Sequence, residues 1–213
     1  MNQPRAARPG EAIQRAQLEL RAAIVKMVKA LALPKGARVA CYGMTDPRFL
    51  AALAESLGPE GQAYAVYRNL PAYQHALLKG ASGDRRVEAI FAADGDGHMD
   101  SEELDLVLLL DVDGFFKRES DLHRQARDSL RPGGRLVILR LLPKELLQQV
   151  ASGLPPSTHE DRRAARLRAN QEIVQLERIG LEFVDELSVL MFRTMRVYRL
   201  PGGSVGAHGD GPA

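Results

Sequence analysis

Short apolar runs, bounded by glycine, proline or polar residues, alternate along this chain with stretches whose apolar positions lie three and four residues apart. The runs predict strands, and the spaced stretches predict helices. The predicted strands are Arg38–Tyr42, Gln62–Tyr67, Val87–Phe91, Leu104–Val112 and Arg135–Leu141. The helices predicted before and between them are residues 11–33, 47–57, 71–78 and 121–130. This alternation predicts an α/β domain that is doubly wound around a mostly parallel sheet.

The pattern changes after the fifth predicted strand. A short helix (144–150), a proline-bearing linker (152–158) and a charged helix (His159–Ile179) come next. Two more strands, Glu182–Leu190 and Arg193–Leu200, then follow with almost nothing between them. Strands this close in sequence pair as a hairpin. We therefore predict an antiparallel C-terminal hairpin in an otherwise parallel sheet.

The boundaries of the domain follow from composition. Residues 11–200 are predicted to form a single domain. Residues 1–10 are polar and proline-bearing and residues 201–213 are rich in glycine, so we expect a flexible N-terminus and a disordered tail. The first helix carries an apolar stripe at helical spacing. That stripe packs on the sheet or forms a dimer surface, so a homodimer is one candidate assembly.

The composition also excludes several classes of protein. A formal net charge of +2 is too small to indicate a nucleic-acid binder. No apolar run is long enough to span a membrane, and the N-terminus lacks the apolar region of a signal peptide. Cys41 is the single cysteine, which excludes an internal disulfide and fits a reducing compartment. We expect a cytoplasmic protein in which Cys41 is a small buried apolar residue rather than a nucleophile.

Several segments together are typical of one family. They are VACYGMTDPRFLAALAESLGPEGQAYAVYR (39–68), LDLVLLLDV (104–112), LRPGGRLVIL (130–139) and the terminal hairpin. With them, residues 30–200 resemble a class I S-adenosylmethionine (SAM)-dependent methyltransferase. The resemblance implies a Rossmann-like seven-stranded sheet whose last strand is antiparallel. It also implies SAM as the cofactor.

The resemblance assigns positions to a cofactor site. In the family, the first strand ends in a carboxylate and leads into a Gly-x-Gly-x-Gly turn, and the second strand ends in a carboxylate that binds the ribose. Placed without gaps, the first carboxylate falls on Cys41 and the second on Tyr67. The three glycines fall on Gly43, Thr45 and Pro47. Only Gly43 matches, so the motif is degenerate.

Each departure removes a group that a SAM site uses. Thr45 places a β-branched side chain where the backbone has to approach the ligand. Pro47 removes an N–H from the N-terminus of the next helix, and Asp46 adds a negative charge that repels a ligand carboxylate. The phenol of Tyr67 cannot accept two hydrogen bonds from a ribose diol as a carboxylate does. We therefore expect this turn to bind SAM poorly.

Other acidic residues leave catalysis open. Asp94 follows the third strand, where the family often has an acid near the adenine. Asp111 and Asp113 follow the fourth strand, where catalytic or substrate-binding groups usually lie. The candidate cofactor-binding residues are Gly43, Thr45, Tyr67, Asp94 and Asp111. The chain is then either a methyltransferase that acts on a small molecule through a divergent site or a non-catalytic module that binds a small molecule or a protein.

The acidic segment AADGDGHMDSEE (92–103) resembles a calcium-binding loop. Its candidate ligands are Asp94, Asp96, Asp100 and Glu103, with a glycine at the sixth position. Its first position, however, is Ala92, and strands rather than helices are predicted on both sides. The alternatives are weak calcium binding and a solvated acidic loop before a buried strand.

Overall fold

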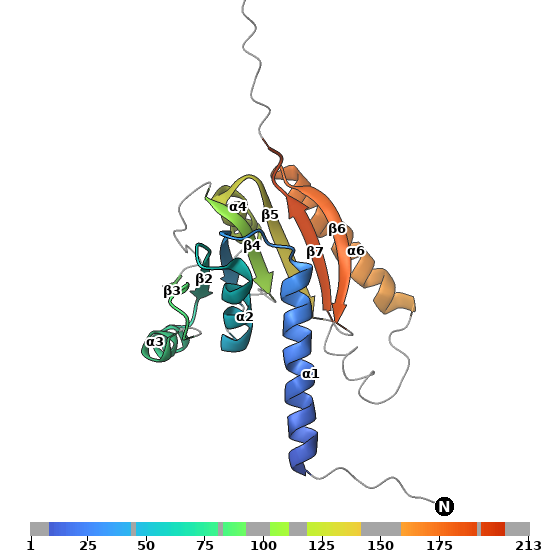
Figure 1. The fold of residues 1–213 in the computed structure, drawn as a ribbon. Coiled ribbons are helices and arrows are strands. Elements are labelled where there is room, and N and C mark those ends of the chain that lie inside the picture. Colours follow the sequence, from blue (N-terminus) through green and yellow to red (C-terminus); the bar gives the residue numbers. More distant parts are fainter. Residues whose placement is uncertain are drawn as a thin grey trace, which may run out of the picture.

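The computed structural model describes residues 9–43, 46–80, 83–92, 103–110, 119–141, 159–190 and 193–202. Within these residues, seven strands form one sheet in the order β3-β2-β1-β4-β5-β7-β6 (Figure 1). The strands are β1 (Arg38–Tyr42), β2 (Gln62–Tyr67), β3 (Val87–Phe91), β4 (Leu104–Leu110), β5 (Leu130–Leu141), β6 (Glu182–Leu190) and β7 (Arg193–Arg199). The helices are α1 (Pro9–Ala30), α2 (Pro47–Leu57), α3 (Leu70–Lys79), α4 (Glu119–Ser129) and α6 (His159–Arg178).

The topology confirms the predicted doubly wound sheet with its C-terminal hairpin. Strands β1 to β5 pair in parallel with one another, whereas β7 runs antiparallel to both β5 and β6. The bounds of β1, β2 and β3 are those predicted. The carboxyl ends of the parallel strands therefore meet at one edge of the sheet, where ligands bind in open α/β folds.

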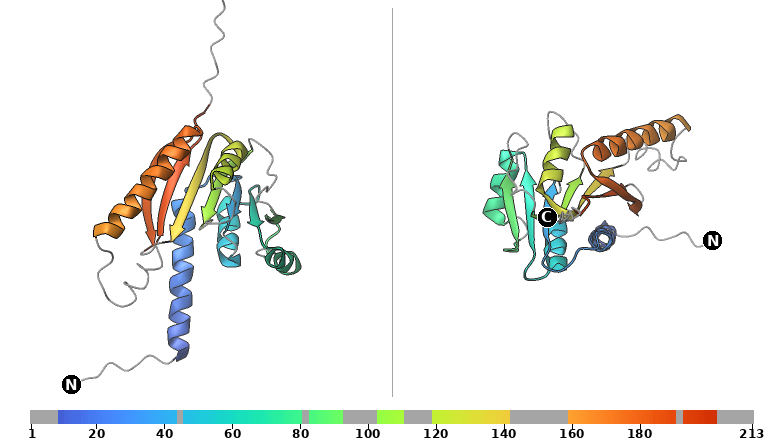
Figure 2. Two further views of the ribbon diagram at one scale, coloured as in Figure 1. Left: turned by 180° about the vertical axis from the view of Figure 1, so that it is seen from behind. Right: turned by 90° about the horizontal axis from the view of Figure 1, so that it is seen from above.

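Helices cover both faces of this sheet (Figure 2). On one face, α1 and α2 bury residues such as Met27 and Leu53. On the other face, α4 and α6 bury Leu122 and Leu176. Strand β4 supplies alternate residues to both apolar clusters, as expected of a central parallel strand. No helix among the described residues is long and apolar enough to cross a bilayer.

The end of α1 differs from the prediction for a tertiary reason. The helix ends at Ala30 rather than at residue 33. Ala32 has a φ of 46°, which is outside the helical range. Nη2 of Arg135 donates to the carbonyl oxygens of Leu31 (2.7 Å) and Ala32 (3.1 Å). This side chain from β5 satisfies carbonyl groups that the helix end leaves open.

Residues 131–134 form an irregular part of β5, which begins before the predicted Arg135. Leu104 of β4 pairs with Leu130 and Leu106 pairs with Arg135, so the residues between them bulge from the ladder. A Cβ atom on Gly134 would lie 2.8 Å from the carbonyl oxygens of both Arg131 and Leu104. Only glycine fits this close approach of two strands.

Some predictions fall on residues outside the described ranges. They are the helix at 144–150, the linker at 152–158, the last two residues of the strand predicted over 104–112, and most of the two terminal segments. Helix α1 begins at Pro9, so residues 9–10 belong to it.

Candidate functional site

The turn after β1 is the centre of the predicted cofactor site. Gly43 follows the strand with a φ of 75°, which is the left-handed conformation that favours glycine. Cys41, at the position of the family's carboxylate, is fully buried, and burial raises the pKa of its thiol to about 12. This confirms that Cys41 is a buried apolar residue. Thr45 lies outside the described residues.

The backbone N–H groups at the N-terminus of α2 donate to acceptors within the protein. Pro47 has no N–H, and the N–H of Arg48 donates to Oδ1 of Asp46 at 2.9 Å. The N–H of Phe49 also hydrogen-bonds to the Asp46 side chain, and that of Leu50 donates to the carbonyl oxygen of Asp46 at 3.1 Å. Over the described first turn, each backbone donor that could hold an anionic ligand is therefore engaged within the helix.

Asp46 carries its own counter-ion at this turn. Nη2 of Arg48 lies 2.7 Å from Oδ2 of Asp46, and Nε lies 3.1 Å from Oδ1. The hydrogen bond from Arg48 lowers the pKa of Asp46, so the cap is ionised at neutral pH. The negative charge predicted to repel a ligand is thus compensated by a cation two residues away. The turn offers an internal ion pair rather than an unpaired charge.

Tyr67 ends β2 at the place predicted for the ribose carboxylate. It is 4% exposed, and burial raises the pKa of its phenol. Its ring centroid lies 6.3 Å from that of Tyr73 on α3, and the Tyr73 ring stacks on Phe91 of β3 at 5.4 Å. The N–H of Ala92 donates to the carbonyl oxygen of Tyr67 at 2.8 Å. Tyr67 is therefore part of the apolar core at this edge of the sheet.

The structure brings two of the five predicted cofactor-binding residues together. Tyr42 pairs with Val66, so Gly43 and Tyr67 follow at the same level on neighbouring strands. The other three, Thr45, Asp94 and Asp111, lie outside the described residues.

The one described member of the predicted calcium site lies at the opposite edge. Glu103 precedes the amino end of β4, where it forms an ion pair with Arg38. The other candidates, Asp94, Asp96 and Asp100, lie outside the described residues. Within the part of the chain that the structure describes, no three His, Cys, Asp or Glu side chains are grouped as metal ligands.

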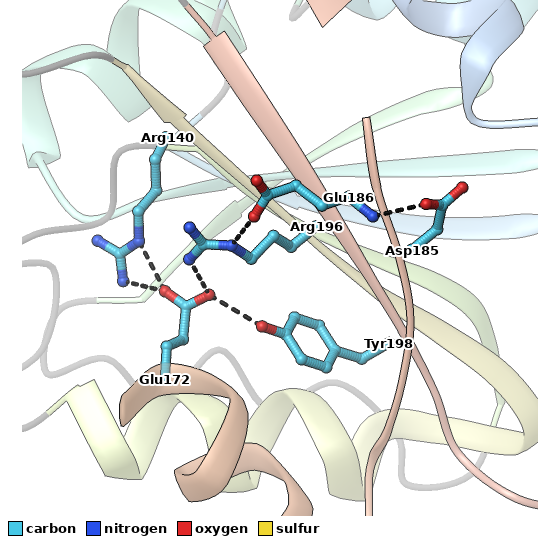
Figure 3. A network of polar contacts seen from close by, with 6 residues as sticks. All are labelled: Arg140, Glu172, Asp185, Glu186, Arg196 and Tyr198. Carbon is cyan, nitrogen blue, oxygen red and sulfur yellow. Dashed lines mark hydrogen bonds and ion pairs between the residues drawn. The ribbon is translucent and has the colours of Figure 1, made fainter. Parts of the chain in front are cut away.

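A buried ionic network, which the sequence analysis did not identify, joins α6 to the sheet (Figure 3). Glu172 of α6 is 6% exposed. Its carboxylate accepts from Nε of Arg140 at 2.7 Å, from Nη1 of Arg196 at 2.9 Å and from the hydroxyl of Tyr198 at 3.0 Å. Arg196 also donates through Nε to Glu186 of β6 at 2.6 Å.

The network is internally satisfied. Burial alone would raise the pKa of Glu172, but the guanidinium groups of Arg140 and Arg196 outweigh it and lower that pKa. Burial, followed by the Glu172 charge, raises the pKa of Tyr198. An ionised carboxylate with three donors is suited to anchoring a helix rather than to acid–base chemistry. One sequence signal could have revealed it, because Glu172 shares a helix face with the buried Leu176.

Comparisons with known proteins identify the fold. No family model and no curated protein sequence matches the chain. A SAM-dependent methyltransferase from Aquifex aeolicus is 15% identical, with a TM-score of 0.65 over 83% of this chain and 89% of that one. A chain in the complex between the Haloferax volcanii Trm112 methyltransferase activator and the putative methyltransferase is 11% identical, with a TM-score of 0.61 over 90% and 95%.

A third solved structure is a geranyl diphosphate methyltransferase in complex with SAM. It is 11% identical, with a TM-score of 0.61 over 92% of each chain. Identities this low establish architecture and leave chemistry open. This chain has the fold of class I SAM-dependent methyltransferases.

Proposed function

We propose that this protein is a methyltransferase-like module that does not use SAM for catalysis and serves instead in binding or as a scaffold. The observation that carries the proposal is the closed N-terminus of α2. Its donors are engaged by Asp46, or are absent at Pro47. A SAM site needs such donors for the amino-acid end of the cofactor.

The end of β2 supports the same conclusion. A ribose diol is held best by a carboxylate that accepts both hydroxyl groups, and Tyr67 offers a core-packed phenol instead. Loss of that bidentate contact costs on the order of 2–3 kcal/mol, or roughly tens- to hundreds-fold in affinity. Taken with the closed helix terminus, the residues at this turn do not fit the cofactor.

A second candidate function is methyl transfer to a small molecule through a divergent site. Gly43 favours it, because the residue keeps the left-handed conformation at the one matching glycine of the motif. The whole sheet of the family is also kept, and a protein with this fold has been solved with SAM. In this case Asp94 and Asp111, which follow β3 and β4 in sequence, are the candidate polar groups.

Calorimetric titration of the full chain with SAM distinguishes the two functions. The non-catalytic proposal expects a dissociation constant weaker than about 100 µM. A constant of about 10 µM or tighter overturns it and favours the methyltransferase. The protein's thermal unfolding, measured on the same sample, verifies that the titrated chain is folded.

Two further properties stay predictions. Weak calcium binding by residues 92–103 predicts a higher melting temperature in millimolar calcium, and no shift would exclude it. A cytoplasmic location is supported by the single, fully buried thiol of Cys41, which suits a reducing compartment.

A further inference from the structure

Helix α3 exposes the apolar residues that a surface helix normally buries. Leu70, Leu77 and Leu78 are 46%, 56% and 87% exposed. Ala76 is its only buried side chain, and Tyr73 is half-buried. Burial of a leucine side chain stabilises a fold, so three exposed leucines on ten residues are apolar surface that this fold does not bury. Clusters of this kind mark interaction surfaces.

Groups other than the leucines help to hold α3 in place. The Asn69 side chain caps the helix by accepting from the N–H of Ala72 at 3.2 Å. Gly80 follows the helix with a φ of 70°. Tyr73 joins the helix to the sheet by stacking on Phe91 of β3. The helix is thus held at the β3 edge, and its three leucines stay exposed.

The charged residues nearest to these leucines in the sequence are cations. Residues 61–83 contain no aspartate or glutamate, whereas the exposed Arg68 lies two residues before α3 and the exposed Lys79 is its last residue. The exposed Glu88 of β3 pairs in register with Tyr64, which packs on the sheet face opposite to that of Ala76. In the sequence the leucines of α3 are therefore flanked by cations, and the next acid, Asp84, is paired with Arg86.

We propose that Leu70, Leu77 and Leu78, together with Arg68 and Lys79, form a docking surface for an acidic protein segment that presents apolar side chains. We call these five residues the α3 surface. Apolar contacts would supply the binding energy, and the cations would select an acidic partner. A second copy of this chain fits less well, because a symmetric contact brings the same cations together. The proposal is independent of whether SAM binds.

The first test uses two synthetic helical peptides with leucines at helical spacing, one with glutamates and the other with lysines at the remaining positions. The full chain should bind the glutamate peptide at least about tenfold more tightly than the lysine peptide in fluorescence anisotropy. Leu77→Gln with Leu78→Gln should weaken that binding at least about tenfold, because glutamine keeps the helix but removes the apolar contact. The matched control is Leu18→Gln on α1, where the leucine is 65% exposed, and it should bind as the wild type does.

A charge reversal tests the specificity. Arg68→Glu with Lys79→Glu should lose the glutamate peptide and gain the lysine peptide, whereas Lys29→Glu on α1 should change neither. Equal binding of the two peptides, or no binding at about millimolar concentration, overturns the proposal. A wild-type dimer in light scattering that the double glutamine variant abolishes also overturns it, because the surface then belongs to a second copy. Binding to phosphatidylserine vesicles that this variant abolishes overturns it as well, because the surface then belongs to a membrane.

Discussion

Nη2 of Arg48 lies 2.7 Å from Oδ2 of Asp46, while the backbone N–H of Arg48 donates to Oδ1 of the same carboxylate at 2.9 Å. One side chain is therefore both the cap of α2 and the partner of a cation in the first turn. In a nucleotide-binding α/β fold, this helix terminus is the natural place for a ligand's negative charge. Here the protein's own carboxylate occupies that role.

Removal of the cap should destabilise the protein. Asp46→Ala should lower the free energy of unfolding by about 1 kcal/mol, because the N–H of Arg48 loses its acceptor. Asp46→Asn should cost less, since the amide oxygen still accepts. Urea denaturation at neutral pH measures both. An alanine variant as stable as the wild type would show that the cap contributes nothing.

The stability that Asp46→Asn loses should also depend on pH. The hydrogen bond from Arg48 lowers the pKa of Asp46 in the folded state. Its contribution to stability is therefore present above the ordinary carboxyl pKa and is lost as pH falls through the lowered folded value, below about pH 4. Relative to wild type, Asp46→Asn should lose less stability at acid pH than at neutral pH.

Restoration of the family's groups should restore affinity for SAM. Thr45→Gly, Pro47→Gly and Tyr67→Asp together should strengthen binding at least about tenfold, because they add an N–H, open the turn and supply a carboxylate for the diol. Calorimetry measures the change. An unchanged affinity in a folded triple variant would mean that the ligand does not use this turn.

Tyr67→Asp carries a cost that the restoration experiment has to control. Tyr67 is 4% exposed and contacts Tyr73, so a carboxylate there is partly buried in apolar surroundings. The double variant Thr45→Gly with Pro47→Gly leaves this core intact and should gain part of the affinity. The triple variant with Asn at position 67 separates the carboxylate charge from the loss of the ring.

The sequence predicts those parts of the fold that depend on local pattern. The bounds of β1, β2 and β3 follow from short runs rich in apolar residues. The end of α1 could not be predicted in this way. It depends on Arg135, which comes from a strand more than a hundred residues later and has no signature in the helix itself.

The candidate site shows the same division. The placement of Gly43 beside the end of β2 follows from the strand order, so the sequence predicts it. The burial of Tyr67 against Tyr73 depends on how α3 packs on the sheet, which the sequence pattern does not predict. The sequence does not single out Glu172, because it lies in a helix rich in charged residues, and such runs usually form a solvated face. Only the fold places that one carboxylate between β5 and β7.

The buried network predicts a large difference between two glutamates. Glu172→Gln should lower the free energy of unfolding by roughly 3–5 kcal/mol, because it leaves Arg140 and Arg196 without their shared counter-ion. Glu186→Gln should cost less than about 1 kcal/mol, since the Glu186 side chain is 45% exposed. Urea denaturation of the two variants makes the comparison. Equal losses would contradict the anchoring role of Glu172.

The single thiol gives a direct measure of how tightly β1 is enclosed. Cys41 is fully buried with a pKa of about 12, so the native chain holds almost no reactive thiolate at pH 8. Iodoacetamide should label the folded protein at least about a hundredfold more slowly than the urea-unfolded chain. Because the chain has one cysteine, each labelling event reports on this strand alone.

The rate of labelling should rise with urea in parallel with unfolding, since the thiol becomes accessible only when the sheet opens. Rapid stoichiometric labelling of the folded protein would place Cys41 at an open site instead, and the position of the family's carboxylate would then be accessible to a ligand after all.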